Sequence, residues 1–74
     1  MQNIDFELRG EYIELDKLLK ATGLAESGGR ARVMITEGLV QVDGQPESRK
    51  TAKIRPGQVI GLQGARITVL AAAT

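Results

Sequence analysis

Among the side chains that could bind a ligand or take part in catalysis, the basic ones form the clearest cluster in this sequence. Those between residues 30 and 55 are Arg30, Arg32, Arg49, Lys50, Lys53 and Arg55. No acid interrupts the run from Arg49 to Arg55. Arginine offers a planar fork that binds phosphate, and lysine offers a mobile point charge. The chemistry that this stretch indicates is therefore the binding of a polyanion.

Residues that usually perform catalysis are scarce. The chain has no cysteine and no histidine, so it lacks thiolate ligands, disulfides, the commonest metal ligand and the usual general base. No two carboxylates show a convincing paired arrangement. We expect no catalytic residue, no metal and no cofactor. An enzyme working through carboxylates or lysines is the least favoured hypothesis.

The charge is unevenly divided along the chain. Residues 1–29 carry a net charge of −3 and residues 30–74 carry +4, which gives the overall +1. Such asymmetry can orient a protein toward a polyanion. The 74 residues predict one small domain, 1–74, and we expect a monomer. No apolar run approaches the ~20 residues of a membrane span and no signal peptide is evident, so we expect a cytoplasmic protein.

Two helices are predicted in the first half of the chain. Residues 3–9 alternate apolar and polar side chains and predict a half-buried strand before them. The first helix follows Ile13 and ends at Gly23, and the second begins at its N-cap Ser27 and ends near Glu37, before Gly38. Their expected buried positions are Leu15, Leu18, Leu19 and Ala21 in the first helix, and Ala31, Met34 and Ile35 in the second.

Strands dominate the second half. Residues 39–42, 59–62 and 66–70 predict strands, with turns at Asp43-Gly44, Pro56-Gly57 and Gly64, and 71–74 form a tail. The loop from Gln45 to Lys53 carries Arg49, Lys50 and Lys53, with Arg55 just beyond it. The order β-α-α-β-β-β predicts an α+β fold. The two N-terminal helices should pack on one side of a small, curved, mostly antiparallel sheet.

Some positions allow two interpretations. Gly28 and Gly29 begin the second helix, where they could expose amides to a phosphate or form a flexible turn without a ligand. Arg30 and Arg32 point in different directions on a helix, so one could reach a ligand while the other pairs with Glu26 or Glu37. Lys17 and Lys20 are better explained as a solvated face than as ligand contacts.

Several spaced motifs occur together in order. They are Ser27, Ala31-Arg32, Ile35, Gly38, Val40-Gln41-Val42-Asp43-Gly44 and Lys53-Ile54-Arg55-Pro56-Gly57-Gln58-Val59-Ile60. This pattern resembles the RNA-binding domain named after ribosomal protein S4, also called the αL motif, with a motif core at about 14–62. The chain departs from the family at Asp43, where asparagine is commoner, and at Gln58, where aspartate is commoner. Tyr12-Ile13, Gly28-Gly29 and Arg49-Lys50 resemble small stand-alone bacterial members of the YbcJ type.

The resemblance implies binding to structured RNA, either ribosomal or transfer RNA, and a role on ribosomal particles in assembly, quality control or the handling of stalled subunits. By position, Arg32 and Lys53 match basic residues of the family, and Arg49 and Lys50 match the YbcJ-type pair. Arg30 and Arg55 are included for their charge, and Gly28 and Gly29 for their amides. Since the basic stretch has no aromatic residue on which a base could stack, we expect recognition of backbone and shape. The alternative is an adaptor that binds protein through its acidic half or a strand edge, without RNA.

Overall fold

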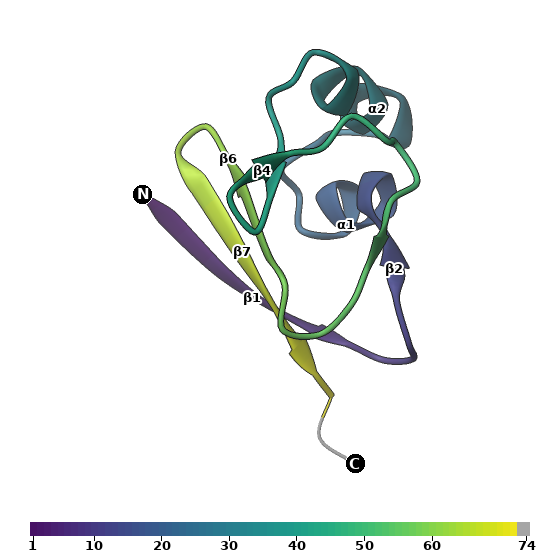
Figure 1. Ribbon diagram of the computed structural model, residues 1–74, viewed down its shortest axis with the longest axis vertical. Coiled ribbons are helices and arrows are strands. Elements are labelled where there is room, and N and C mark those ends of the chain that lie inside the picture. Colours follow the sequence, from purple (N-terminus) through teal and green to yellow (C-terminus); the bar gives the residue numbers. More distant parts are fainter. Residues whose placement is uncertain (73–74) are drawn as a thin grey trace.

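The computed structural model describes residues 1–72, and its two helices lie on the same side of a β-sheet (Figure 1). In chain order the elements are β1 (Gln2–Leu8), β2 (Ile13–Glu14), α1 (Leu15–Ala21), α2 (Gly28–Thr36), β3 (Gln41–Val42), β4 (Gln45–Pro46), β5 (Lys53–Ile54), β6 (Val59–Leu62) and β7 (Ala65–Ala71). The predicted α+β class, with early helices and late strands, is confirmed. None of the helices in the described residues is long and apolar enough to cross a membrane.

The larger sheet has the strand order β1-β7-β6-β3-β4. β1 runs parallel to β7, while the other three pairs are antiparallel. β2 and β5 pair in a separate two-stranded ladder. The sheet is therefore mostly antiparallel, as the sequence predicts.

A two-residue turn joins β3 to β4. Val42 faces Gln45 across the hairpin, and the intervening Asp43 and Gly44 have φ angles of 51° and 82°. Positive φ at both central residues is the signature of a type I′ turn, whose twist suits the flanking strands. The carboxylate of Asp43 also accepts a hydrogen bond of 2.9 Å from the amide of Val59. This side chain therefore ties the hairpin to the start of β6.

The residues that start α2 and that terminate both helices are those that the sequence predicts. The Ser27 hydroxyl accepts a hydrogen bond of 3.1 Å from the Arg30 amide, which makes Ser27 the N-cap of α2. Gly23 and Gly38 follow the two helices with φ angles of 80° and 79°, a conformation that glycine adopts without a steric penalty.

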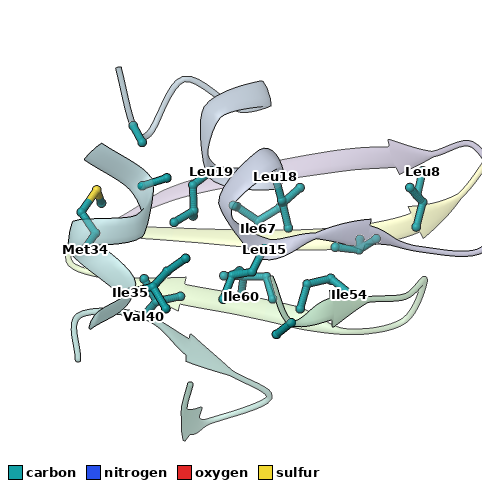
Figure 2. Close-up of a cluster of buried hydrophobic side chains, with 14 residues drawn as sticks. Leu8, Leu15, Leu18, Leu19, Met34, Ile35, Val40, Ile54, Ile60 and Ile67 are labelled. Atoms are coloured by element: carbon teal, nitrogen blue, oxygen red, sulfur yellow. The ribbon is translucent and has the colours of Figure 1, made fainter. Parts of the chain in front are cut away.

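Aliphatic side chains fill the space between the helices and the sheet (Figure 2). The side chains with almost no exposed surface are Leu15, Leu18, Leu19, Ile35, Val40, Ile54, Ile60, Ile67 and Val69. Burial of each contributes about 1.5–3 kcal/mol relative to full exposure. This core fixes the position of α1 and α2 relative to the loop between β4 and β5.

The structure differs from the predicted boundaries in the second half. The predicted loop from Gln45 to Lys53 contains β4 and the first residue of β5, and β3 covers only the second half of the predicted strand 39–42. Leu39 is still tied to α2, because its amide donates to the carbonyl of Met34. β7 extends through Ala71, the first residue of the predicted tail, and residues 73–74 of that tail lie outside the described residues.

Candidate nucleic-acid interface

Arg32 is held in place by Asp16, a residue of the neighbouring helix. Its Nη1 donates a hydrogen bond of 3.2 Å to Oδ2 of Asp16, in an ion pair whose side chains are 49% and 7% exposed, respectively. The other oxygen of Asp16 accepts from the amide of Lys17 at 2.9 Å. A carboxylate with so little exposure needs such partners to offset its lost hydration. The guanidinium is therefore oriented by α1 while about half of the Arg32 side chain remains open to solvent.

The same guanidinium lies against the first turn of α2. A β-carbon added to Gly28 would stand 3.4 Å from Nη1 of Arg32, whereas one added to Gly29 would meet only the Ser27 hydroxyl, at 3.8 Å. A β-carbon at Gly28 would thus be in van der Waals contact with the Arg32 guanidinium, and a larger side chain would compete with it for space. The first amides of a helix have no partner within it and carry partial positive charge. Arg32 consequently lies at the end of α2 that favours an anion.

The loop between β4 and β5, residues 47–52, is called here the basic loop. It is fastened to the start of α1 by two backbone hydrogen bonds. The amide of Leu15 donates to the carbonyl of Ala52 at 2.9 Å, and the amide of Asp16 donates to that of Lys50 at 3.1 Å. Asp16 therefore holds Arg32 through its side chain and Lys50 through its backbone. Arg32 and the backbone of Lys50, which are far apart in the sequence, are therefore bound to the same residue of α1.

Arg49 pairs with Glu47 inside the basic loop. Its Nε and Nη2 donate to the two carboxylate oxygens at 3.1 and 3.0 Å, and its amide donates to Oε2 at 3.1 Å. These hydrogen bonds lower the pKa of Glu47 below its ordinary value, with the side-chain bond from Arg49 as the main cause, and they raise the pKa of Arg49. The Arg49 side chain is 78% exposed, so much of its guanidinium surface can still meet a ligand.

Lys53 follows the basic loop in β5. Its ammonium lies 5.0 Å from the centre of the Tyr12 ring, within the range of a cation–π interaction. Glu14, which faces Lys53 across the β2–β5 ladder, instead pairs with Lys17 at 3.0 Å. The hydrogen bond from that pairing raises the pKa of Lys17. Lys53 and Arg49 also line one shallow hollow on the surface.

Arg30 and Arg55 are exposed, and across the described part of the chain their side chains form no hydrogen bond with this network. Arg30 contributes its amide to the Ser27 cap, and the amide of Arg55 donates to Oε1 of Gln58 at 2.7 Å. Within residues 1–72, the side chains of Arg30, Lys50, Lys53 and Arg55 take part in no ion pair. Their charges are therefore not neutralised by a neighbouring carboxylate.

The predicted pairing of the α2 arginines is wrong in one respect. The partner of Arg32 is Asp16, sixteen positions away, and neither Glu26 nor Glu37 forms an ion pair in the described residues. Sequence reasoning assigns Asp16 no part in the site and therefore misses its role in holding Arg32. The pair joins residues sixteen positions apart on different helices, so no spacing within one helix signals it.

Comparisons with known proteins agree with this architecture. A family model described as an S4 domain matches residues 6–70. The candidate RNA-binding protein YbcJ of Escherichia coli K12 is 45% identical over 60 residues, covering 81% of this chain and 86% of YbcJ. The probable ribosome maturation protein RlbA of Bacillus subtilis 168 is 33% identical over 54 residues, covering 73% of this chain and 76% of RlbA.

A solved structure extends the likeness to the fold. The solution structure of E. coli YbcJ, described as revealing an αL motif involved in RNA-binding, superposes with a TM-score of 0.69. The two chains share 39% identity in that comparison, which covers 96% of this chain and 89% of YbcJ. On the evidence of the family match and of these relatives, the chain belongs to the S4 domain family.

Proposed function

We propose that this protein is a non-catalytic RNA-binding protein that recognises structured RNA through backbone phosphates and shape. One observation carries the proposal. The guanidinium of Arg32 is held by the nearly buried Asp16 next to the glycine start of α2, and the amide of the same residue holds the carbonyl of Lys50. We call the residues Gly28, Gly29, Arg32, Arg49, Lys50 and Lys53 the basic surface. Arg30 and Arg55 contribute long-range attraction.

The chemistry of the basic surface suits phosphate. A guanidinium whose position is fixed loses less freedom on binding, and the free amides of a helix start add neutral donors. Residues 28–55 contain no aromatic side chain, and the nearby Tyr12 ring lies under Lys53. Tyr12 is 42% exposed, but the Lys53 ammonium lies over its ring, so the basic surface offers little platform for stacking unpaired bases. This favours a folded RNA such as a helix or junction.

The comparisons support a ribosomal context for the proposal. YbcJ is named for RNA binding and RlbA for ribosome maturation. We propose that the ligand is ribosomal or transfer RNA, and that the protein acts in subunit assembly, quality control or the handling of stalled subunits in the cytoplasm. It would do so as a monomer with one domain, 1–74, whose motif core spans about 14–62. The S4 domain family is not a family of enzymes.

Binding to folded ribosomal RNA over a range of salt concentrations tests the proposal. The test variant carries Arg32→Ala and Lys50→Glu. The matched control carries Arg9→Ala and Arg66→Glu, which change the net charge equally. Arg66 alternates with the buried Ala65 and Ile67, so it projects from the opposite face of the sheet. Circular dichroism verifies the fold of both variants.

The slope of log affinity against log salt should fall by about two in the test variant, because each of the two altered side chains accounts for roughly one phosphate neutralised. The control should bind nearly as the unaltered protein does. Equal affinity and slope in the test variant and the unaltered protein would show that the basic surface is not the binding site. Equal binding of unstructured polyuridine and folded RNA would remove the claim for shape.

A further inference from the structure

The larger sheet ends at β1, a strand of seven residues with no further strand beside it in the described residues (Figure 1). An edge of this kind offers unpaired backbone groups that can accept a strand from another chain. This edge is distinct from the basic surface, because the residues of the basic surface lie in α2, the basic loop and β5. It has no part in the function proposed above.

Two hydrogen bonds at the ends of β1 establish which backbone groups are free. The amide of Gln2 donates to the carbonyl of Gly64 at 2.8 Å, and the carbonyl of Leu8 accepts from the amide of Ala72 at 3.1 Å. Alternate residues of a strand direct their N–H and C=O groups to the same edge. The even-numbered residues of β1 therefore bond to β7, and Asn3, Asp5 and Glu7 direct their backbone groups outward.

The strand lacks most of the features that protect an edge from pairing. Gln2–Leu8 contains no proline, lysine or glycine, and its register with β7 runs through seven consecutive pairs without a bulge. Ile4 and Phe6 are half-buried on the helix side of the sheet, while Asp5 and Glu7 are exposed on the other side. A complementary strand would carry apolar side chains on one face and basic side chains on the other.

A second copy of this chain is a poor occupant. Antiparallel pairing of two β1 strands centred on Asp5 would place Asp5 opposite Asp5. Parallel pairing through the outward groups of Asn3, Asp5 and Glu7 would need an odd register shift, which puts the acids of one copy beside Ile4 and Phe6 of the other. Like charges directly opposite each other destabilise strand pairing. Arg66 of β7 is paired with Asn3 on the neighbouring strand and lies diagonal to Asp5, whereas Glu7 is paired with the apolar Leu70.

We propose that the free edge of β1 binds an extended basic segment of another protein by strand addition. The backbone of Asn3, Asp5 and Glu7 supplies the hydrogen bonds. The carboxylates of Asp5 and Glu7 select basic residues, and the half-buried Ile4 and Phe6 select apolar residues on the alternate positions. The protein would then join a protein segment at one edge while its basic surface stays free to bind RNA.

The test uses ¹⁵N-labelled full-length protein and a capped peptide of sequence VKVKVKV, followed by NMR. The peptide should shift the amide signals of Asn3, Asp5 and Glu7, and a VEVEVEV peptide should bind at least about tenfold more weakly because its acids face those of β1. Two further peptides carry N-methyl groups on the three lysines or on the two internal valines. Each set of N-methyl groups removes the N–H donors on one edge of the peptide, and the two sets affect opposite edges. Because only one edge of the peptide can pair with β1, only one of the two methylated peptides should bind.

A charge-swapped protein keeps the test independent of any single peptide. Asp5→Lys with Glu7→Lys changes two exposed side chains and leaves the β7 ladder intact, and it should reverse the preference in favour of VEVEVEV. Several results would overturn the proposal: no shifts in β1, shifts confined to β4, equal binding of both N-methylated peptides, or an unreversed preference. Dimerisation of the protein alone through β1 would also overturn it.

Discussion

Replacing Asp16 by asparagine separates two opposite effects of one carboxylate. As a negative charge near the basic surface, Asp16 should repel RNA. As the partner that holds Arg32 at 3.2 Å, it should help RNA to bind. Asparagine keeps the size of the side chain but removes the charge. The direction of the change in RNA affinity therefore reports which effect is larger.

The magnitudes can be compared. Two charges about 8 Å apart in water interact by about 0.5 kcal/mol before screening, so relief of repulsion should tighten binding by at most about twofold. Ordering a free arginine on binding costs about 0.5–1.5 kcal/mol, equivalent to a two- to twelvefold loss of affinity. We expect Asp16→Asn to weaken RNA binding by this factor relative to Glu11→Gln, which removes an exposed acid and serves as the charge-matched control.

The fold should survive the change. An exposed ion pair contributes about 0.2–1 kcal/mol, and loss of one partner of a buried pair costs about 3–5 kcal/mol. Asp16 is nearly buried and Arg32 is half-exposed, so a cost of about 1–2 kcal/mol is reasonable. A domain of this length has a total stability of about 4–11 kcal/mol. Urea unfolding measures the decrease in stability.

A double-mutant cycle completes the assay. In an Arg32→Ala background there is no guanidinium to orient, so Asp16→Asn should no longer weaken binding and should tighten it slightly, as Glu11→Gln does. Fluorescence anisotropy with labelled ribosomal RNA measures all four proteins. If Asp16→Asn binds RNA as tightly as Glu11→Gln does in the original background, the reasoning about orientation is refuted.

Three further predictions concern neighbouring side chains. Gly28→Leu should displace the Arg32 guanidinium and weaken RNA binding severalfold, since even a β-carbon would stand 3.4 Å from Nη1; unchanged affinity would contradict this packing role. Arg49→Ala should return the lowered pKa of Glu47 toward its ordinary value in a carboxyl NMR titration, and an unchanged pKa would argue against the pair. Because the folded-state pKa of Glu47 is lowered, the pair stabilises the fold at neutral pH and this contribution is lost as the pH falls through that pKa. Asp43→Ala should cost about 1–3 kcal/mol in urea unfolding because it loses the bond to the Val59 amide and keeps a positive φ, whereas Asp43→Asn should cost less; equal costs would exclude that explanation.

Local chemistry makes much of the fold predictable. Ser27, Gly23 and Gly38 mark the helix ends, and Asp43-Gly44 marks the hairpin turn, because each motif acts through its own backbone geometry. The parallel pairing of β1 with β7 joins opposite ends of the chain and leaves no local signal. The short strands β4 and β5 likewise escape prediction, since pairs of two residues carry no periodicity.

The residues of the candidate site also divide into those that the sequence predicts and those that only the structure shows. Residue types and spacing single out Arg32, Lys50 and Lys53, since unbalanced charge is visible in a sequence. The link from Asp16 to Arg32 depends on the packing of α1 against α2, so no spacing rule within one helix could predict it. In the structure, a side chain at Gly28 would contact the Arg32 guanidinium, whereas one at Gly29 would not.

The most direct test of the central claim is crosslinking of the protein to RNA in extract of the source cells, with both crosslinked partners identified. Mass spectrometry locates the crosslinked peptides, and sequencing identifies the RNA. The account predicts crosslinks within residues 28–32 and 49–55 to structured ribosomal or transfer RNA, which disappear as the salt concentration rises. Crosslinks confined to other parts of the chain, or no RNA crosslink at low salt, would contradict it.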